Sequence, residues 1–174
     1  MKYIQLDSQF NIIGIGSIPQ KYTDYNIEVE DNFDIINKSW NGSNWVDDIE
    51  AIKRKCHNTI NKWYDDYKSG LDNTVSSELG EPIEAGKDAL IIACMIYIAY
   101  QNGRTVPAEY KTKNGMKALT ENKIEKLFLD ELYIDYLTKF QYKETAKAEI
   151  NACSNKNEVE LVCIKYSDIF PEYV

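Results

Sequence analysis

The chain has 174 residues, of which 44% are apolar, so it can bury one substantial core and a small second one. Its 28 acidic and 20 basic residues give a net charge of −8 at pH 7, and its longest basic run is residues 53–55. Because phosphate neutralisation needs a clustered positive surface, this composition argues against nucleic acid as a partner.

The pattern of apolar residues and cysteines favours a protein that folds in a reducing cytoplasm. The longest apolar run, residues 89–100, has 12 residues, whereas a membrane-spanning helix needs about 20. An acid at Asp7 and the lack of an early apolar stretch argue against a signal peptide. The four cysteines include no C-x-x-C pair, which fits a compartment where thiols stay reduced.

The first 48 residues predict a small β module that is more acidic than the rest of the chain, with three lysines and eight acids. Short runs rich in β-branched and aromatic residues alternate there with turn-forming residues, as is typical of strands. The runs are residues 1–6, 10–15, 26–29 and 33–36.

A tryptophan pair closes this module. Asn41-Gly42 favours a tight reversal, which would set Trp40 and Trp45 on neighbouring strands with their rings in contact. Because an isolated hairpin is marginally stable in water, we expect the strands to form one small antiparallel sheet.

From residue 49 the apolar residues recur at three- and four-residue steps, which predicts a first helix of about five turns. Asp47 or Asp48 is the expected N-cap, and Gly70 the expected end. Residues 71–85 are polar and predict a loop.

A second helix is predicted to begin between Pro82 and Asp88 and to end at Gln101. It is apolar on nearly all sides, so we expect protein to surround it on most of them. Residues 103–119 contain Asn114-Gly115 and predict a short hairpin or an irregular connection.

A long third helix is predicted from residue 121 to about 152, with Thr120 as its cap. Asn155 and Glu158 then resemble a capping box that opens a short final helix. The side chains expected on the buried stripe of the third helix are Ile124, Phe128, Leu129, Leu132, Tyr133, Tyr136, Leu137, Phe140 and Ile150.

These elements predict an α+β fold. A small N-terminal antiparallel β module (1–48) precedes an antiparallel helical domain (49–164) of three main helices plus a short C-terminal helix, and residues 165–174 form a C-terminal docking tail that leaves the fold intact when removed. The residues expected to contact other subunits are Trp40, Trp45, Tyr166, Ile169, Phe170 and Tyr173.

The sequence contains no phosphate loop, dinucleotide fingerprint, nucleophile elbow or zinc spacing. The only histidine, His57, follows Cys56, and adjacent helical residues point about 100° apart, so the two cannot readily act as base and nucleophile. We therefore predict no catalytic residue, no cofactor and no metal. The 13 tyrosines favour interface contacts, with a carbohydrate-stacking platform as the alternative.

Two acid pairs, Asp47-Asp48 and Asp65-Asp66, could bind a hard cation. Neither has the alternating oxygen ligands of a calcium loop, so helix caps and solvated faces are favoured. A small metal-dependent enzyme that uses these carboxylates is kept as an alternative.

Residues 51–164 resemble a helical domain of uncharacterised function found at the C-terminus of tail-fibre, tail-tip and related virion proteins of tailed bacteriophages. The resemblance lies in the order of five stretches, and the last is the most specific. They are AIKRKCHNTINKWYDDY, DALIIACMIYIAY, a short segment with Asn-Gly, ALTENKIEKLF and KAEINACSNKNEVELVCI. The W-x-G-x-x-W hairpin before them is similar to what precedes this domain in such proteins.

The resemblance implies a structural virion component, a small tail, fibre or capsid-accessory protein that is made and folded in the host cytoplasm. Its expected partners are other virion proteins and further copies of itself, and it carries over no catalytic residues. An assembly chaperone that is absent from the mature particle is the second expectation.

Overall fold

The computed structural model, which describes residues 1–70 and 73–173, begins with two separate small sheets. In the first, β1 (Lys2–Leu6) lies between β2 (Ile12–Gly16) and β3 (Tyr25–Val29), and both pairings are antiparallel. The second is a hairpin of β4 (Lys38–Trp40) and β5 (Trp45–Asp47). The expectation of one continuous sheet is therefore wrong.

The break between the two sheets has a local cause. Residues 33–36, predicted as a strand, form none and lie between turns at 31–32 and 36–37. The Phe33 amide donates to the carbonyl of Glu30 (3.0 Å), and the Ile36 amide donates to the Asp34 carboxylate (2.9 Å). Asn37 then has a positive φ of 60°. Such backbone cannot continue a ladder, so β4 starts as a new unit.

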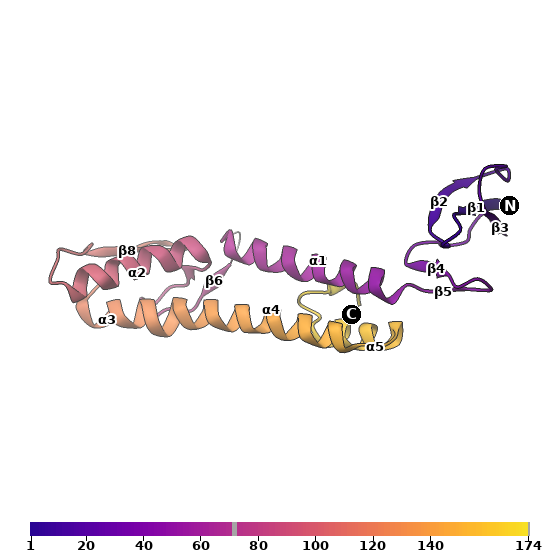
Figure 1. The fold of residues 1–174 in the computed structure, drawn as a ribbon. Helices are drawn as coiled ribbons and strands as arrows, with labels where there is room; N and C mark the ends of the chain where they lie inside the picture. Colours follow the sequence, from indigo (N-terminus) through magenta and orange to yellow (C-terminus); the bar gives the residue numbers. More distant parts are fainter. Residues whose placement is uncertain (71–72, 174) are drawn as a thin grey trace.

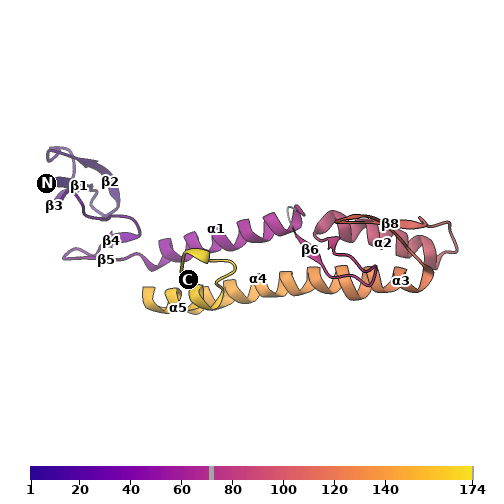
Figure 2. The ribbon, with the colours of Figure 1, turned by 180° about the vertical axis from the view of Figure 1, so that it is seen from behind.

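The helical domain is a long hairpin (Figure 1). α1 (Ile49–Lys68) and α2 (Lys87–Gln101) lie end to end along one side of a continuous helix made of α3 (Glu121–Glu125), the π-helix η1 (Lys126–Tyr133) and α4 (Ile134–Ala152). α5 (Lys156–Lys165) and the 3-10 turn η2 (Pro171–Tyr173) fold back near the start of α1, and the view from behind agrees (Figure 2). The molecule is therefore elongated, and its fold is α+β, which confirms the predicted fold class.

Side-chain caps set two helix starts. The Asp48 carboxylate accepts from the Ala51 amide at 2.9 Å at the start of α1. Asn155 accepts from the Glu158 amide at 3.0 Å, and the Glu158 carboxylate reaches back to the Ser154 amide, which confirms the predicted capping box. At the start of α3, however, the Thr120 side chain makes no cap bond, and only its carbonyl accepts from Lys123.

Two short hairpins flank α2. β6 (Thr74–Val75) and β7 (Ile83–Glu84) form a two-residue ladder within the segment predicted as a loop. β8 (Glu109–Thr112) and β9 (Gly115–Ala118) form the hairpin predicted around Asn114-Gly115. No helix in the described part of the chain combines the length and apolarity that crossing a membrane requires.

The π-helix changes which residues of the long helix face the core. A π turn holds more residues than an α turn, so it rotates the following face away from a 3.6-residue period. Ile124, Leu132 and Ile150 of the predicted stripe are buried, whereas Tyr133 and Phe140 are 44% and 43% exposed. The predicted stripe is therefore correct only in part.

The C-terminal residues belong to the core, so the expectation of an exposed tail is wrong. Tyr166, Ile169 and Phe170 are each at most 3% exposed and pack with residues of α1, α4 and α5. Polar contacts hold the same segment, since the Tyr166 hydroxyl donates to Glu149 (2.9 Å) and the Tyr142 hydroxyl donates to Asp168 (2.6 Å). Removal of this segment would open the core that joins α1 to α4.

Replacing Phe170 with alanine tests this assignment. Because the ring is 1% exposed, the F170A variant should lose about 3–5 kcal/mol of unfolding free energy in urea denaturation followed by circular dichroism. The matched control is L161A, which truncates a side chain of α5 that is 68% exposed and should change stability by less than about 0.5 kcal/mol. Equal stability of F170A and wild type would contradict the placement of the tail.

Tyr110, on β8 beneath α2, predicts a loss of stability in alkali. Burial, and to a smaller extent the charges of Glu84 and Glu131, raise the pKa of Tyr110 to about 12 from its ordinary 10.0. The buried neutral phenol therefore contributes its full stability below pH 10, and this is lost as the pH rises from 10 to about 12, at a cost on the order of 2 kcal/mol. The Y110F variant keeps the ring without the ionisable group, so it should lose less stability over that range. If the unfolding free energies of Y110F and wild type fell equally between pH 10 and 12, this role of Tyr110 would be refuted.

Candidate interaction surfaces

The tryptophan hairpin is formed as predicted, but it faces inward. Trp40 and Trp45 are directly opposed in the β4–β5 ladder, with ring centroids 5.3 Å apart in an edge-on arrangement. Trp45 also packs on Phe33 (5.5 Å), and both indoles are half-buried against the core residues Ile4 and Leu6. The two indoles thus help to close the β module.

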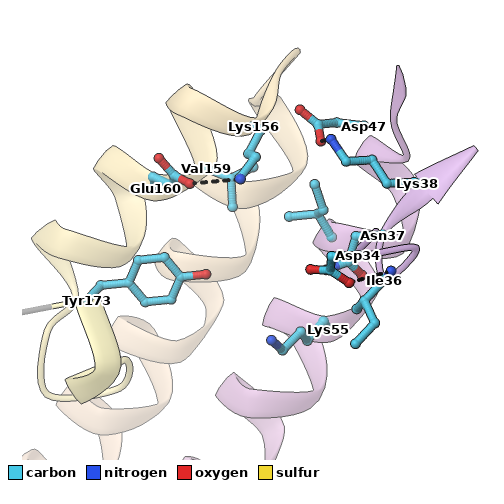
Figure 3. A pocket seen from close by; sticks show the side chains of 11 residues that line it. Asp34, Ile36, Asn37, Lys38, Asp47, Lys55, Lys156, Val159, Glu160 and Tyr173 are labelled. Carbon is cyan, nitrogen blue, oxygen red and sulfur yellow. Dashed lines mark hydrogen bonds and ion pairs between the residues drawn. The ribbon is translucent and has the colours of Figure 1, made fainter. Parts of the chain in front are cut away.

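A small pocket of about 130 Å³ lies where the β module meets the helical domain. Figure 3 shows its two walls, one from the β4–β5 hairpin and α1, and the other from α5 and Tyr173. The lining residues are Asp34, Ile36, Asn37, Lys38, Asp47, Ile52, Lys55, Lys156, Val159, Glu160 and Tyr173.

The charges in this pocket are largely paired. Lys38 binds Asp47 at 2.6 Å, and this bond holds the pKa of the Asp47 carboxyl below its ordinary value. Lys156 lies 3.5 Å from Glu160 on the opposite wall. At the junction, the amide of Asp48, the N-cap residue of α1, donates to the carbonyl of Asn37 (2.7 Å), just before β4. Each ion pair thus joins two residues of the same wall, and neither crosses the pocket.

Of the four C-terminal residues predicted as contacts, only Tyr173 reaches the surface. It is half-buried on the rim of the pocket in Figure 3, and its ring meets Phe170 edge-on at 6.2 Å. Tyr166, Ile169 and Phe170 are buried in the core and are corrected from contact residues to core residues.

The outer face of α2 is the most exposed apolar surface on a helix of this domain. Only Ala93 and Ile96 of this helix are buried, against α3, η1 and β8. The expectation that protein surrounds α2 on most sides is therefore wrong. Four large apolar side chains stand in solvent: Ile91 (45%), Ile92 (52%), Met95 (65%) and Ile98 (53%).

The outer face of α2 stays exposed because no further helix of the described chain packs on it. α2 packs against α3 and η1, the β8 strand runs along it, and no further helix lies beyond it in either view (Figures 1 and 2). Solvated helix faces normally carry charge, yet residues 89–103 contain none. Exposed apolar faces of this kind are typical of interaction sites, so this face of α2 is the candidate surface.

A second hollow, of about 400 Å³, is open between α1 and α4. Tyr64, Tyr136 and Phe140 form its aromatic wall, and Lys68 lies 5.2 Å from the centre of the Tyr64 ring. The Tyr64 hydroxyl is buried and has no hydrogen-bond partner among the described residues. Burial raises its pKa, and the nearby Tyr136 hydroxyl adds to the shift without meeting hydrogen-bond geometry. The carbohydrate-stacking alternative would belong in this hollow.

The acid pairs bind lysines or cap a helix. Asp65 lies 2.7 Å from Lys68, which lowers the pKa of its carboxyl, and Asp66 lies 2.5 Å from Lys62. Asp47 binds Lys38 and Asp48 caps α1, as described above. Among residues 1–70 and 73–173, no three histidine, cysteine or acidic side chains converge as metal ligands.

Cys56 and His57 point to different surroundings. The Cys56 sulfur lies 3.9 Å from the sulfur of Cys163 within the core, and this contact together with burial raises the pKa of the Cys163 thiol. The His57 Nε2 is buried and has no partner in the part of the chain that the structure describes. The geometry thus holds Cys56 as a packing residue.

Comparisons of the chain with protein-family models, with curated proteins and with solved structures found no match.

The acid pairs generate a test of the metal-dependent alternative. Since lysines already neutralise Asp65 and Asp66, millimolar Mg²⁺, Ca²⁺ or Mn²⁺ should leave the melting temperature equal to that in EDTA, for wild type and for the D65N/D66N variant alike. A metal-dependent rise in wild type that the variant lacks would instead favour the enzyme.

Proposed function

We propose that the protein is a structural component of a bacteriophage virion, a small tail, fibre or capsid-accessory protein that acts through contacts with other proteins. The resemblance of residues 51–164 to a helical domain of phage virion proteins motivates the proposal. The observation that carries the contact role is the exposed, uncharged face of α2, at the end of the helical domain farthest from the β module (Figure 1).

The chemistry of the side chains supports contact rather than catalysis. The carboxylates that could have bound a cation are engaged by lysines or by a helix amide, and the one cysteine next to a histidine packs against another thiol. Apolar surface without charge, by contrast, gains free energy when a partner covers it, at roughly 25 cal/mol per Å².

Incorporation into particles tests the proposal. Mass spectrometry of purified particles should detect the protein at a fixed copy number per particle. Met95→Lys should lower this copy number by about tenfold or more, because covering an unpaired ammonium costs more than the 1.4 kcal/mol that each factor of ten requires.

The control is Leu161→Lys, which places the same charge at an equally exposed apolar position on α5 and should leave the copy number unchanged. A protein abundant in infected lysate but missing from purified particles would overturn the proposal in favour of the assembly chaperone. Equal loss of incorporation for both lysine variants would overturn the role of the α2 face in incorporation.

A further inference from the structure

The exposed face of α2 has the spacing of a helix-pairing seam. Ile91, Met95 and Ile98 follow one another at steps of four and three residues, as the core positions of a coiled coil do. Asp88 and Asn102 lie seven residues before and after Met95, so they occupy the same stripe. The seam is therefore apolar in the middle, polar at its ends and centred on Met95.

The charges at the two ends are opposite. Asp88 lies in the first turn of α2. At the other end Gly103 adopts a positive φ of 63°, and the Arg104 amide turns back to bond the Ala99 carbonyl at 2.8 Å. This reversal brings Arg104 to the rim of an open hollow that it shares with Met95 and Ile98. Within the described residues, neither Asp88 nor Arg104 has an ion-pair partner.

From this seam we propose that α2 pairs antiparallel with α2 of a second copy of the chain. A two-fold axis through Met95 places Met95 against Met95, Ile91 against Ile98, and Asp88 beside Arg104 of the other copy. The antiparallel arrangement also sets opposite helix dipoles side by side. A parallel pair would bring Asp88 against Asp88 and Arg104 against Arg104, which disfavours it.

The size of the seam sets the strength of the pairing. α2 has 15 residues, so the seam is about 22 Å long at 1.5 Å per residue. One face of such a helix is smaller than the roughly 800 Å² that each partner buries in a stable complex. We therefore expect a reversible dimer whose population depends on protein concentration.

The position of α2 allows this contact. It lies at the end of the molecule opposite the β module, so a second copy can approach it without meeting the N-terminal strands (Figures 1 and 2). The inference rests on the proposed function in that it takes the α2 face as one of the surfaces used in assembly. It names a second copy as the partner there.

Disulfide cross-linking of the purified full-length chain tests the register. In a Cys94→Ser background, which removes the partly exposed native thiol of α2, Met95→Cys should form covalent dimers on mild oxidation. Ile91→Cys should not, because in the antiparallel pair its two copies lie about 12 Å apart along the axis, beyond the ~7 Å limit for a disulfide. Mixing the Ile91→Cys and Ile98→Cys proteins should restore cross-linking.

Charge exchange provides a second, independent measurement. Asp88→Arg and Arg104→Asp should each weaken the dimer by about tenfold in light scattering or sedimentation, and the variant that carries both changes should recover it. Circular dichroism of each variant establishes that α2 still folds. If either single variant unfolds, the Met95→Cys and Ile91→Cys comparison decides alone.

The outcomes separate this inference from the proposed function. Self-cross-linking of Ile91→Cys would overturn the antiparallel arrangement, as would a trimer by light scattering. A monomer at every concentration would overturn the pairing, and the proposed function would still stand if that monomer entered particles. A dimer that is missing from particles would support the pairing while defeating the virion role.

Discussion

The structure depends on the burial of one apolar face of the continuous α3–η1–α4 helix. α1 covers its C-terminal half and α2 covers its N-terminal half, so two successive helices share a single partner. This arrangement makes the helical domain long and only two helices thick. α1 and α2 each bury one face against the α3–η1–α4 helix. The opposite face of each is then exposed to solvent unless another molecule covers it. The exposed face of α1 carries lysines and acids, whereas the exposed face of α2 is apolar.

The C-terminal segment completes the half of the domain that α2 does not reach. Tyr166, Ile169 and Phe170 fill the space between α1, α4 and α5, and hydroxyl bonds to Glu149 and Asp168 fix the chain above them. In a domain two helices thick, this C-terminal segment covers the core where a third helix would lie in a globular bundle. Aromatic residues suit this role because one ring buries a large area while a hydroxyl stays paired.

Opposite ends of the molecule therefore offer different chemistry. Near the β module, charged side chains line the pocket between the β4–β5 hairpin and α5, and a backbone bond from Asp48 to Asn37 joins the start of α1 to the segment before β4. The far end presents an apolar helix face bracketed by one acid and one base. These two kinds of surface are separated by the length of α1.

Local chemistry by itself determined two helix starts and one tight turn. Asp48 and Asn155 cap helices through bonds to amides three residues away, and Asn41-Gly42 brings Trp40 and Trp45 together across four residues. Such contacts lie within a few residues in the chain, so the sequence alone contains them. Tertiary structure decided what lies against each face. The apolar run 89–100 has the same sequence whether or not other elements cover it. The eight-residue π-helix that starts at Lys126 changes which later residues of the long helix face the core. The burial of Phe170 depends on contact with α1, more than 100 residues earlier in the chain.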